Sequence, residues 1–176
     1  MAAKLGISEG RVEAFLKKRE AIMSWRSGNT AEHAGRKIMT ETKERTCQER
    51  VAKHYESRIE DLRALWAAYQ SGDEEVEDLG TFNEYGLCFD YVAVGTFTDQ
   101  EEGYFRYQIS YGGPSEEFRF YTDAELNAHT IKFWFLDWGD GAFKHVTDDD
   151  EPMMLEIWEF FVEIGSVEAE LAKATA

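Results

Sequence analysis

Two carboxylates in the C-terminal half of the chain have a spacing that could support metal binding or catalysis. Asp137 and Asp140 lie three residues apart in the run Asp-Trp-Gly-Asp-Gly, which follows an apolar segment. Carboxylates paired at the end of a strand can hold a divalent cation or act as a general acid and a general base. Asp and Gly are also residues that tight turns prefer. A turn is therefore our preferred interpretation, and a metal-dependent enzyme is an alternative.

The other residues that could do such chemistry carry no catalytic or metal-binding signature. They are dispersed along the chain: His33, His54, His129, His145, Cys47 and Cys88. Zinc sites need closely spaced pairs of these ligands, and a calcium loop needs alternating carboxylates around a glycine. The Asp-Asp-Asp-Glu run at 148–151 has no such glycine and favours helix capping. We expect a protein that is not an enzyme, has no metal or cofactor, and keeps both cysteines as thiols.

The strongest signal in the sequence is an uneven distribution of charge. The chain has 176 residues and a formal net charge of −16. Residues 1–72 contain 14 Lys/Arg and 10 Asp/Glu, whereas residues 73–176 contain 5 Lys/Arg and 25 Asp/Glu. A surface as negative as the second region repels nucleic acid and attracts basic grooves. We therefore expect a protein partner with a basic surface, and no direct contact with nucleic acid.

Ten acidic residues are candidates for the surface that would meet such a partner. Glu156, Glu159 and Glu163 recur at steps of three and four on a predicted helix, which places their carboxylates about 5–6 Å apart. Successive phosphates of a nucleic-acid strand have a similar spacing. The other candidates precede this helix or lie in predicted loops: Asp148, Asp149, Asp150, Glu101, Glu102, Glu116 and Glu117. Together they could imitate the phosphates of DNA, and ordinary acidic solvation is the alternative interpretation.

Hydrophobic periodicity predicts which elements position these residues. Residues 1–72 are expected to form a helical hairpin, with a turn at 27–30 and a second helix from about Ala34 to Gln70. The apolar seam of that second helix has helical spacing: Cys47, Val51, Tyr55, Ile59, Leu62, Trp66 and Tyr69. Two antiparallel helices would bury such seams against each other, and the seam could also mediate a homodimer.

Residues 73–176 are expected to form an acidic antiparallel sheet covered by a C-terminal helix. Three to four strands are predicted by aromatic and branched residues between turn signals, at Tyr85–Val94, Gly103–Tyr111, Phe118–Tyr121 and Thr130–Trp138. A hairpin is expected around Gly112-Gly113-Pro114, and a helix from about Pro152 to Gly165, followed by a tail helix to about Ala174. The predicted class is α+β.

The sequence contains nothing typical of a membrane or secreted protein. No apolar run approaches the roughly 18 residues that cross a bilayer, and the first residues lack a signal-peptide core. We therefore expect a soluble cytoplasmic protein that has no contact with a membrane.

The opening residues suggest a second kind of function. Leu5-Gly6-Ile7-Ser8, followed by Val12 and Leu16, resembles the turn and recognition helix of helix-turn-helix proteins. Little chain precedes Gly6, so a capped amphipathic helix is the preferred interpretation. The alternative is a DNA-binding regulator that uses residues 8–19, including the basic residues 17–19.

In size, acidity and expected solubility the chain resembles the small acidic DNA-mimic inhibitors of phages and conjugative plasmids. Those proteins occupy the DNA-binding grooves of restriction enzymes, CRISPR effectors or nucleoid proteins. The resemblance is one of character, so it assigns no role to any residue. The segments 85–91, 95–97, 112–114 and 133–138 are also similar to uncharacterised accessory proteins of bacterial plasmids and integrated elements.

These resemblances imply a non-catalytic inhibitor of a bacterial defence system, either anti-restriction or anti-CRISPR, that comes from a mobile genetic element. Its partner would be a nucleic-acid-binding protein of that system. Two alternatives remain beside the metal-dependent enzyme: the DNA-binding regulator, and a helical oligomerisation protein with no connection to nucleic acid.

Overall fold

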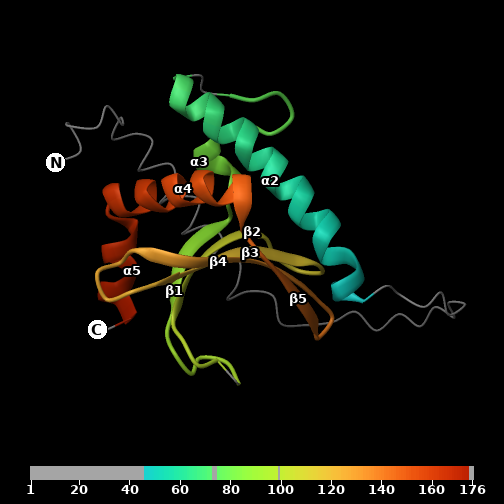
Figure 1. The fold of residues 1–176 in the computed structure, drawn as a ribbon, viewed down its shortest axis with the longest axis vertical. Coiled ribbons are helices and arrows are strands. Elements are labelled where there is room, and N and C mark those ends of the chain that lie inside the picture. Colours follow the sequence, from blue (N-terminus) through green and yellow to red (C-terminus); the bar gives the residue numbers. More distant parts are fainter. Residues whose placement is uncertain (1–45, 73–74, 99, 175–176) are drawn as a thin grey trace, which may run out of the picture.

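The computed structural model describes residues 46–72, 75–98 and 100–174. Within them the chain has an α+β fold, in which a five-stranded antiparallel sheet carries helices on one face (Figure 1). The expected fold class is therefore confirmed for this part of the chain. The first helix of the expected hairpin and the helix-turn-helix resemblance at residues 5–16 lie outside the described residues.

Helix α2, Cys47–Ser71, contains the predicted apolar seam and begins at a capping box. The Thr46 hydroxyl accepts a hydrogen bond from the Glu49 backbone at 3.3 Å, and the Glu49 carboxylate accepts one from the Thr46 backbone at 2.9 Å. Gly72, with a φ of 84°, ends the helix. The extended backbone of Thr46 places the beginning of α2 at Cys47, so one continuous helix from about Ala34 to Gln70 is not formed. Residues 34–45 lie outside the described residues.

The sheet is a meander in which every strand is antiparallel to its neighbours. Its order follows the sequence: β1 Cys88–Val92, β2 Tyr104–Ser110, β3 Ser115–Thr122, β4 Ala128–Asp137 and β5 Asp140–His145. The four predicted strands and the hairpin at Gly112-Gly113-Pro114 are confirmed. The first strand begins later than predicted, because a short helix, α3 Phe82–Tyr85, occupies its expected start.

The fifth strand is a finding that the sequence interpretation missed. Asp137 pairs with Asp140 across a two-residue turn, in which Trp138 and Gly139 have φ values of 46° and 80°. Two positive φ values in succession are typical of a type I′ turn, whose twist matches a β-hairpin. The predicted tight turn is thus confirmed, and it joins β4 to β5.

The C-terminal helices confirm the prediction for this region. A single turn, η2 Asp148–Asp150, leads into α4 Glu151–Glu163, which has Pro152 in its first turn. Gly165, with a φ of 77°, separates α4 from α5, Ser166–Ala174. None of the helices within the described residues is long and apolar enough to cross a membrane.

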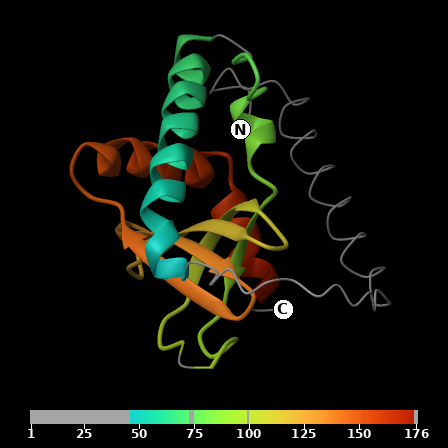
Figure 2. The same cartoon turned by 90° about the vertical axis from the view of Figure 1, so that its right-hand side faces the viewer.

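One hydrophobic core lies between the sheet and the helices. Figures 1 and 2 show α2 and α4 on the same side of the sheet, and α5 turns down beside β1. The strands contribute alternate aromatic residues to this core, such as Phe105, Phe118 and Phe133, each at most 1% exposed. In the described residues the α2 seam therefore packs on β4, β5 and α4. The sequence interpretation had expected it to pack on the first helix of the hairpin.

Candidate functional site

Helix α4 presents the predicted acidic stripe to solvent. Its apolar side, which includes Met154 and Phe161, is buried, whereas Glu156, Glu159 and Glu163 are exposed. Four helical residues advance about 6 Å, so Glu159 and Glu163 lie one turn apart on the same side of α4. Within the described residues neither glutamate makes an ion pair or a hydrogen bond, so both carboxylates are available to a partner.

Glu156 differs from the other two glutamates because it joins α4 to α2. Its Oε2 accepts hydrogen bonds from Trp66 Nε1 at 2.8 Å and from Gln70 Nε2 at 2.9 Å. Both donors lie on α2, so this carboxylate fixes the position of one helix against the other. Glu156 therefore has a structural contact in addition to its predicted place on the acidic stripe.

The acidic turn before α4 is divided in the same way. Asp148 and Asp149 are exposed. The Asp150 carboxylate accepts from the Tyr55 hydroxyl at 2.6 Å and pairs with Arg63 at 2.5 Å. Burial and this hydrogen bond to Asp150 raise the pKa of the Tyr55 hydroxyl, so tyrosine remains the donor. Asp150 thus anchors η2 to α2, and Asp148 and Asp149 remain exposed beside the start of α4.

Glu101 and Glu102 are exposed but lie far from the α4 stripe. They belong to the connection between β1 and β2, which projects from the side of the sheet opposite α4 (Figure 1). A single flat partner surface cannot reach both sides of the sheet. The structure therefore does not bring these two residues together with the acidic residues of η2 and α4.

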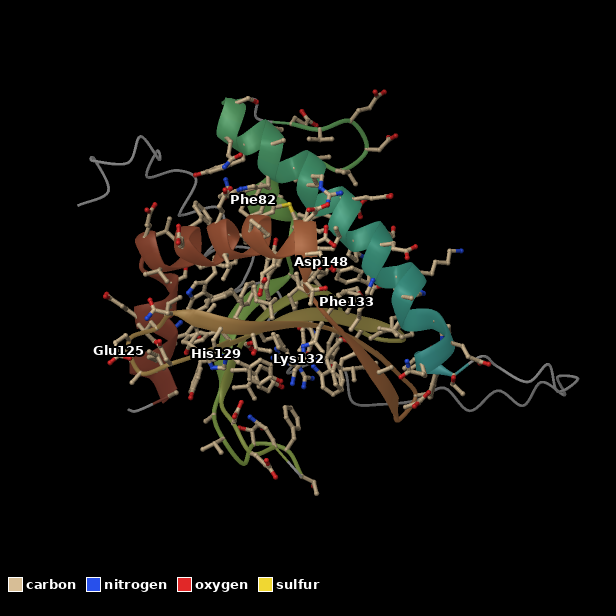
Figure 3. The ribbon with its side chains drawn as sticks, in the orientation of Figure 1. Phe82, Glu125, His129, Lys132, Phe133 and Asp148 are labelled. Atoms are coloured by element: carbon tan, nitrogen blue, oxygen red, sulfur yellow. The ribbon has the colours of Figure 1, made fainter. Side chains whose placement is uncertain are left out.

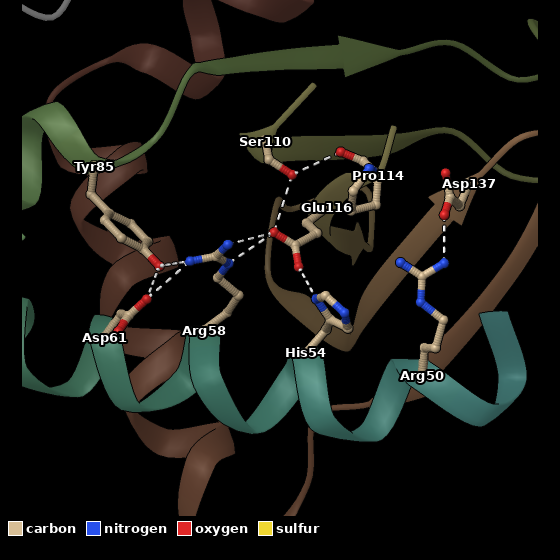
Figure 4. Close-up of polar contacts among 9 residues, drawn as sticks. All are labelled: Arg50, His54, Arg58, Asp61, Tyr85, Ser110, Pro114, Glu116 and Asp137. Carbon is tan, nitrogen blue, oxygen red and sulfur yellow. Dashed lines mark hydrogen bonds and ion pairs between the residues drawn. The ribbon is translucent and has the colours of Figure 1, made fainter. Parts of the chain in front are cut away.

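The expectation that Glu116 and Glu117 lie in an acidic loop is wrong. Both belong to β3, which begins at Ser115, and they are 1% and 2% exposed. Glu116 points toward α2, where it accepts hydrogen bonds from His54 at 2.7 Å and from the Arg58 Nε at 2.8 Å (Figure 4). A buried carboxylate needs such partners, because desolvation of an unpaired charge is strongly unfavourable.

This buried cluster continues along α2. The Ser110 hydroxyl donates to Glu116 at 3.1 Å, and Arg58 also pairs with Asp61 at 3.1 Å. Tyr85, in α3, donates to the Asp61 carboxylate at 2.6 Å (Figure 4). Side chains from α2, α3, β2 and β3 thus share one polar network, which ties the long helix to the β2–β3 hairpin.

Asp137 and Asp140, the pair that could have formed a metal site, hold the beginning of α2. Asp137 pairs with Arg50 at 2.5 Å, and Asp140 accepts from the Cys47 backbone N–H at 2.7 Å. That backbone hydrogen bond lowers the pKa of Asp140. No cluster of three or more candidate metal ligands occurs in residues 46–72, 75–98 and 100–174. These contacts give both carboxylates a structural role at a positively polarised helix end.

The basic residues of the second half are segregated from the acidic helix. Residues 75–98 and 100–174 contain five: Arg106, Arg119, Lys132, Lys144 and Lys173. Four of them belong to strands β2–β5, and Lys173 pairs with Glu170 at 3.0 Å. Neither η2 nor α4 contains a basic residue. The exposed charges of these two elements are therefore all negative.

The sequence interpretation missed a second polar surface, on the face of the sheet that bears no helix among residues 46–72, 75–98 and 100–174. Cross-strand pairing aligns cationic side chains from β2, β3 and β4 there. Alternation along one strand indicates which side chains share a face, but it does not reveal how neighbouring strands align.

No family model, curated protein or solved structure matches the chain. The acidic residues of η2 and α4 and the polar face of the sheet are therefore the basis for a functional inference.

Proposed function

We propose that this protein is a non-catalytic inhibitor that binds a nucleic-acid-binding protein of a bacterial defence system, of the restriction or CRISPR kind. The acidic face, defined here as Asp148, Asp149, Glu159 and Glu163, occupies the basic groove in which that protein holds DNA. One observation carries the proposal: η2 and α4 expose carboxylates without a single basic residue among them. The cations of this half of the chain are in the strands or in the tail helix.

The dimensions of the acidic face suit a short stretch of duplex DNA. Glu163 comes fourteen residue steps after Asp149, which corresponds to about 21 Å along a helix. That length equals about six base pairs of B-form DNA at 3.4 Å per step. Glu159 and Glu163 lie on α4, which is packed into the core through residues such as Met154 and Phe161, both at most 1% exposed, and Asp148 and Asp149 belong to the turn that leads into it. A rigid support lets the carboxylates meet a groove without losing much conformational freedom.

Electrostatics explains why a DNA-binding groove would accept this face. Such a groove is lined with Lys and Arg that release condensed counterions when they meet phosphates. A fixed row of carboxylates offers the same charge, and the net charge of −16 steers the protein toward any strongly basic surface. Binding should therefore weaken steeply as salt rises, because exposed charges are screened within about 8–10 Å at physiological ionic strength.

A pair of charge reversals tests whether the acidic face or the total charge is responsible. The full-length chain is immobilised, exposed to a bacterial lysate at low salt, and the proteins released by rising salt are identified and purified. Their affinity is then compared for Glu159→Lys/Glu163→Lys and for the control Glu56→Lys/Glu60→Lys. The control residues are exposed on α2, and within the described residues they have no partner. Both variants change the net charge by the same amount.

The proposal expects the α4 variant to lose at least tenfold in affinity for a captured DNA-binding protein, while the α2 control retains most of it. Equal losses in the two variants would mean that net charge alone is responsible, as ordinary acidic solvation implies. Unchanged affinity in the α4 variant, or recovery of DNA itself as the bound species, would contradict the proposal.

A further inference from the structure

The face of the sheet that the helices of the described residues leave uncovered carries a row of ionisable side chains that crosses all five strands. Its members are paired neighbours from β1 to β5: Asp90, Arg106, Arg119, Lys132 and His145. Figure 3 shows Lys132 on this face, whereas its neighbour Phe133 lies on the side of the helices. Three adjacent members are cationic, although the region 73–176 has only 5 Lys/Arg. Like charges on neighbouring strands repel each other, so this arrangement calls for an explanation.

Carboxylates compensate two of the three cations. Asp90 holds Arg106 through two hydrogen bonds of 2.9 and 2.6 Å. Glu117, 2% exposed, pairs with Arg119 at 2.6 Å. Lys132 has no carboxylate partner in the described residues. Its ammonium lies over the Tyr121 ring, 4.7 Å from the centroid. The ammonium of Lys132, the fourth member of the row, is therefore left for an anion from outside.

A cleft of about 610 Å³ lies over this row. Strands β2, β3 and β4 form its floor with Tyr104, Arg119 and Trp134, and the β1–β2 connection contributes Phe97 and the segment 100–102. That connection projects on the same side of the sheet (Figure 1). Pockets that bind small molecules usually measure 300–1,000 Å³ and combine apolar walls with a few polar groups. The cleft fits this description.

Two buried hydrogen-bond donors at the cleft have no partner in the described residues: the Tyr104 hydroxyl and the Trp134 indole Nε1. Tyr104 is only 1% exposed, and burial raises its pKa to about 12, so the hydroxyl stays protonated. The Arg119 guanidinium lies over both rings, 4.5 Å from the Tyr104 centroid and 4.1 Å from that of Trp134, and holds them in place. Native proteins rarely leave buried donors unpaired, because the free energy lost when the donor gives up its hydrogen bond to water is then not compensated.

We propose that this sheet-face cleft binds a small aromatic carboxylate. Within the described part of the chain, the Tyr104 hydroxyl, the Trp134 N–H and the Lys132 ammonium are donors without an acceptor. A carboxylate supplies acceptor oxygens together with the negative charge that the ammonium needs. Phe97, which is 54% exposed, and Leu136 offer apolar contact to a ring.

The cleft also selects against ligands with several negative charges. Glu101 and Glu102 line it, and the whole chain carries −16. A polyphosphate would meet strong repulsion, whereas a single carboxylate is compensated by Lys132. This site is independent of the acidic face on α4, which lies on the other side of the sheet.

Calorimetric titration of the full-length chain with 2-naphthoate tests the proposal, and its neutral amide, 2-naphthamide, is the matched ligand control. The expected result is saturable binding of the acid that is at least tenfold tighter than binding of the amide. No saturable binding of the acid, or equal affinity for both compounds, would overturn the proposal.

Two tyrosine variants on the same strand separate binding from folding. Tyr104→Phe removes the unpaired hydroxyl, so naphthoate affinity should fall about tenfold while the melting temperature stays the same or rises. Tyr107→Phe is the control, because Tyr107 faces the helices and its hydroxyl oxygen accepts a hydrogen bond from the Gly86 backbone N–H. It should lower the melting temperature and leave affinity unchanged. Unchanged affinity in Tyr104→Phe, or a melting temperature lowered as much as in the control, would refute the assignment.

Discussion

The buried carboxylate of Glu116 provides a sharp test of how α2 is held on the sheet. We expect Glu116→Gln to destabilise the protein although the shape of the side chain is kept. Both carboxylate oxygens are used, Oε1 by His54 and Oε2 by Arg58 and Ser110. An amide oxygen in the place of Oε2 still accepts from Arg58 and Ser110, but the amide N–H then faces His54 Nδ1, which donates to the carboxylate. The substitution also removes the charge that balances Arg58.

The contacts set the size of the effect. Removing one partner of a buried ion pair typically costs about 3–5 kcal/mol. The Arg58 and His54 side chains are 30% and 32% exposed, so water can solvate them when the carboxylate is lost. Arg58 also keeps its ion pair with Asp61. These points reduce the expected loss to about 2–3 kcal/mol of unfolding free energy, or roughly 5–10 °C in melting temperature for a domain of this size.

Equilibrium urea unfolding, followed by tryptophan fluorescence and by far-ultraviolet circular dichroism, measures this loss. Glu159→Gln serves as the control, because Glu159 is exposed and has no partner in the described residues; its effect should stay within about 0.5 kcal/mol. A double-mutant cycle with Arg58→Met should give a coupling energy of about 1 kcal/mol or more. If Glu116→Gln were no more destabilising than Glu159→Gln, the buried network could not be what anchors α2.

Three further predictions concern the attachment of α2 and the buried thiols. The Cys47 backbone N–H holds the pKa of Asp140 below its usual range, so this stabilisation is present above the unfolded value of about 4 and is lost as pH falls through the folded value. Asp140→Ala should therefore melt at a lower temperature than the wild type at pH 7, and thermal melts should show this difference shrinking below pH 4. Glu156→Ala removes the acceptor of Trp66 Nε1 and should lower the unfolding free energy by about 1 kcal/mol in urea titrations; no change would mean that this contact adds nothing. Burial raises the pKa of the Cys47 thiol, and Cys88 is buried too, so Ellman's reagent should detect no thiol in the native protein at pH 8 and two after unfolding.

Much of the fold could be predicted because each element has a clear local signal. The α2 seam and the buried side of α4 repeat with helical period, and the strands alternate between turn signals. The start of α2 was also encoded locally, since Thr46 and Glu49 form a capping box, but the continuing charged sequence before it suggested a longer helix. Strand β5 was missed because it is short and begins with Asp and Gly, which indicate a turn more strongly than a strand.

The polar contacts could not be predicted, because they depend on how distant segments are aligned. Glu116 lies 58 residues from Arg58, and only the packing of α2 across the hairpin brings them together. The row that contains Arg106 and Lys132 requires the register of every strand, whereas alternation alone gives only the face. The acidic stripe on α4 was predictable, since a single helix fixes the spacing of its residues.

Competition with DNA tests the central claim most directly. A DNA-binding protein captured by the full-length chain is titrated with a fluorescent duplex in the presence of increasing amounts of the chain, and the anisotropy of the duplex is recorded. Occupation of the DNA groove predicts mutually exclusive binding: the duplex is displaced completely, and its apparent affinity falls in proportion to the concentration of the chain. A stable complex of chain, captured protein and duplex would contradict groove occupation.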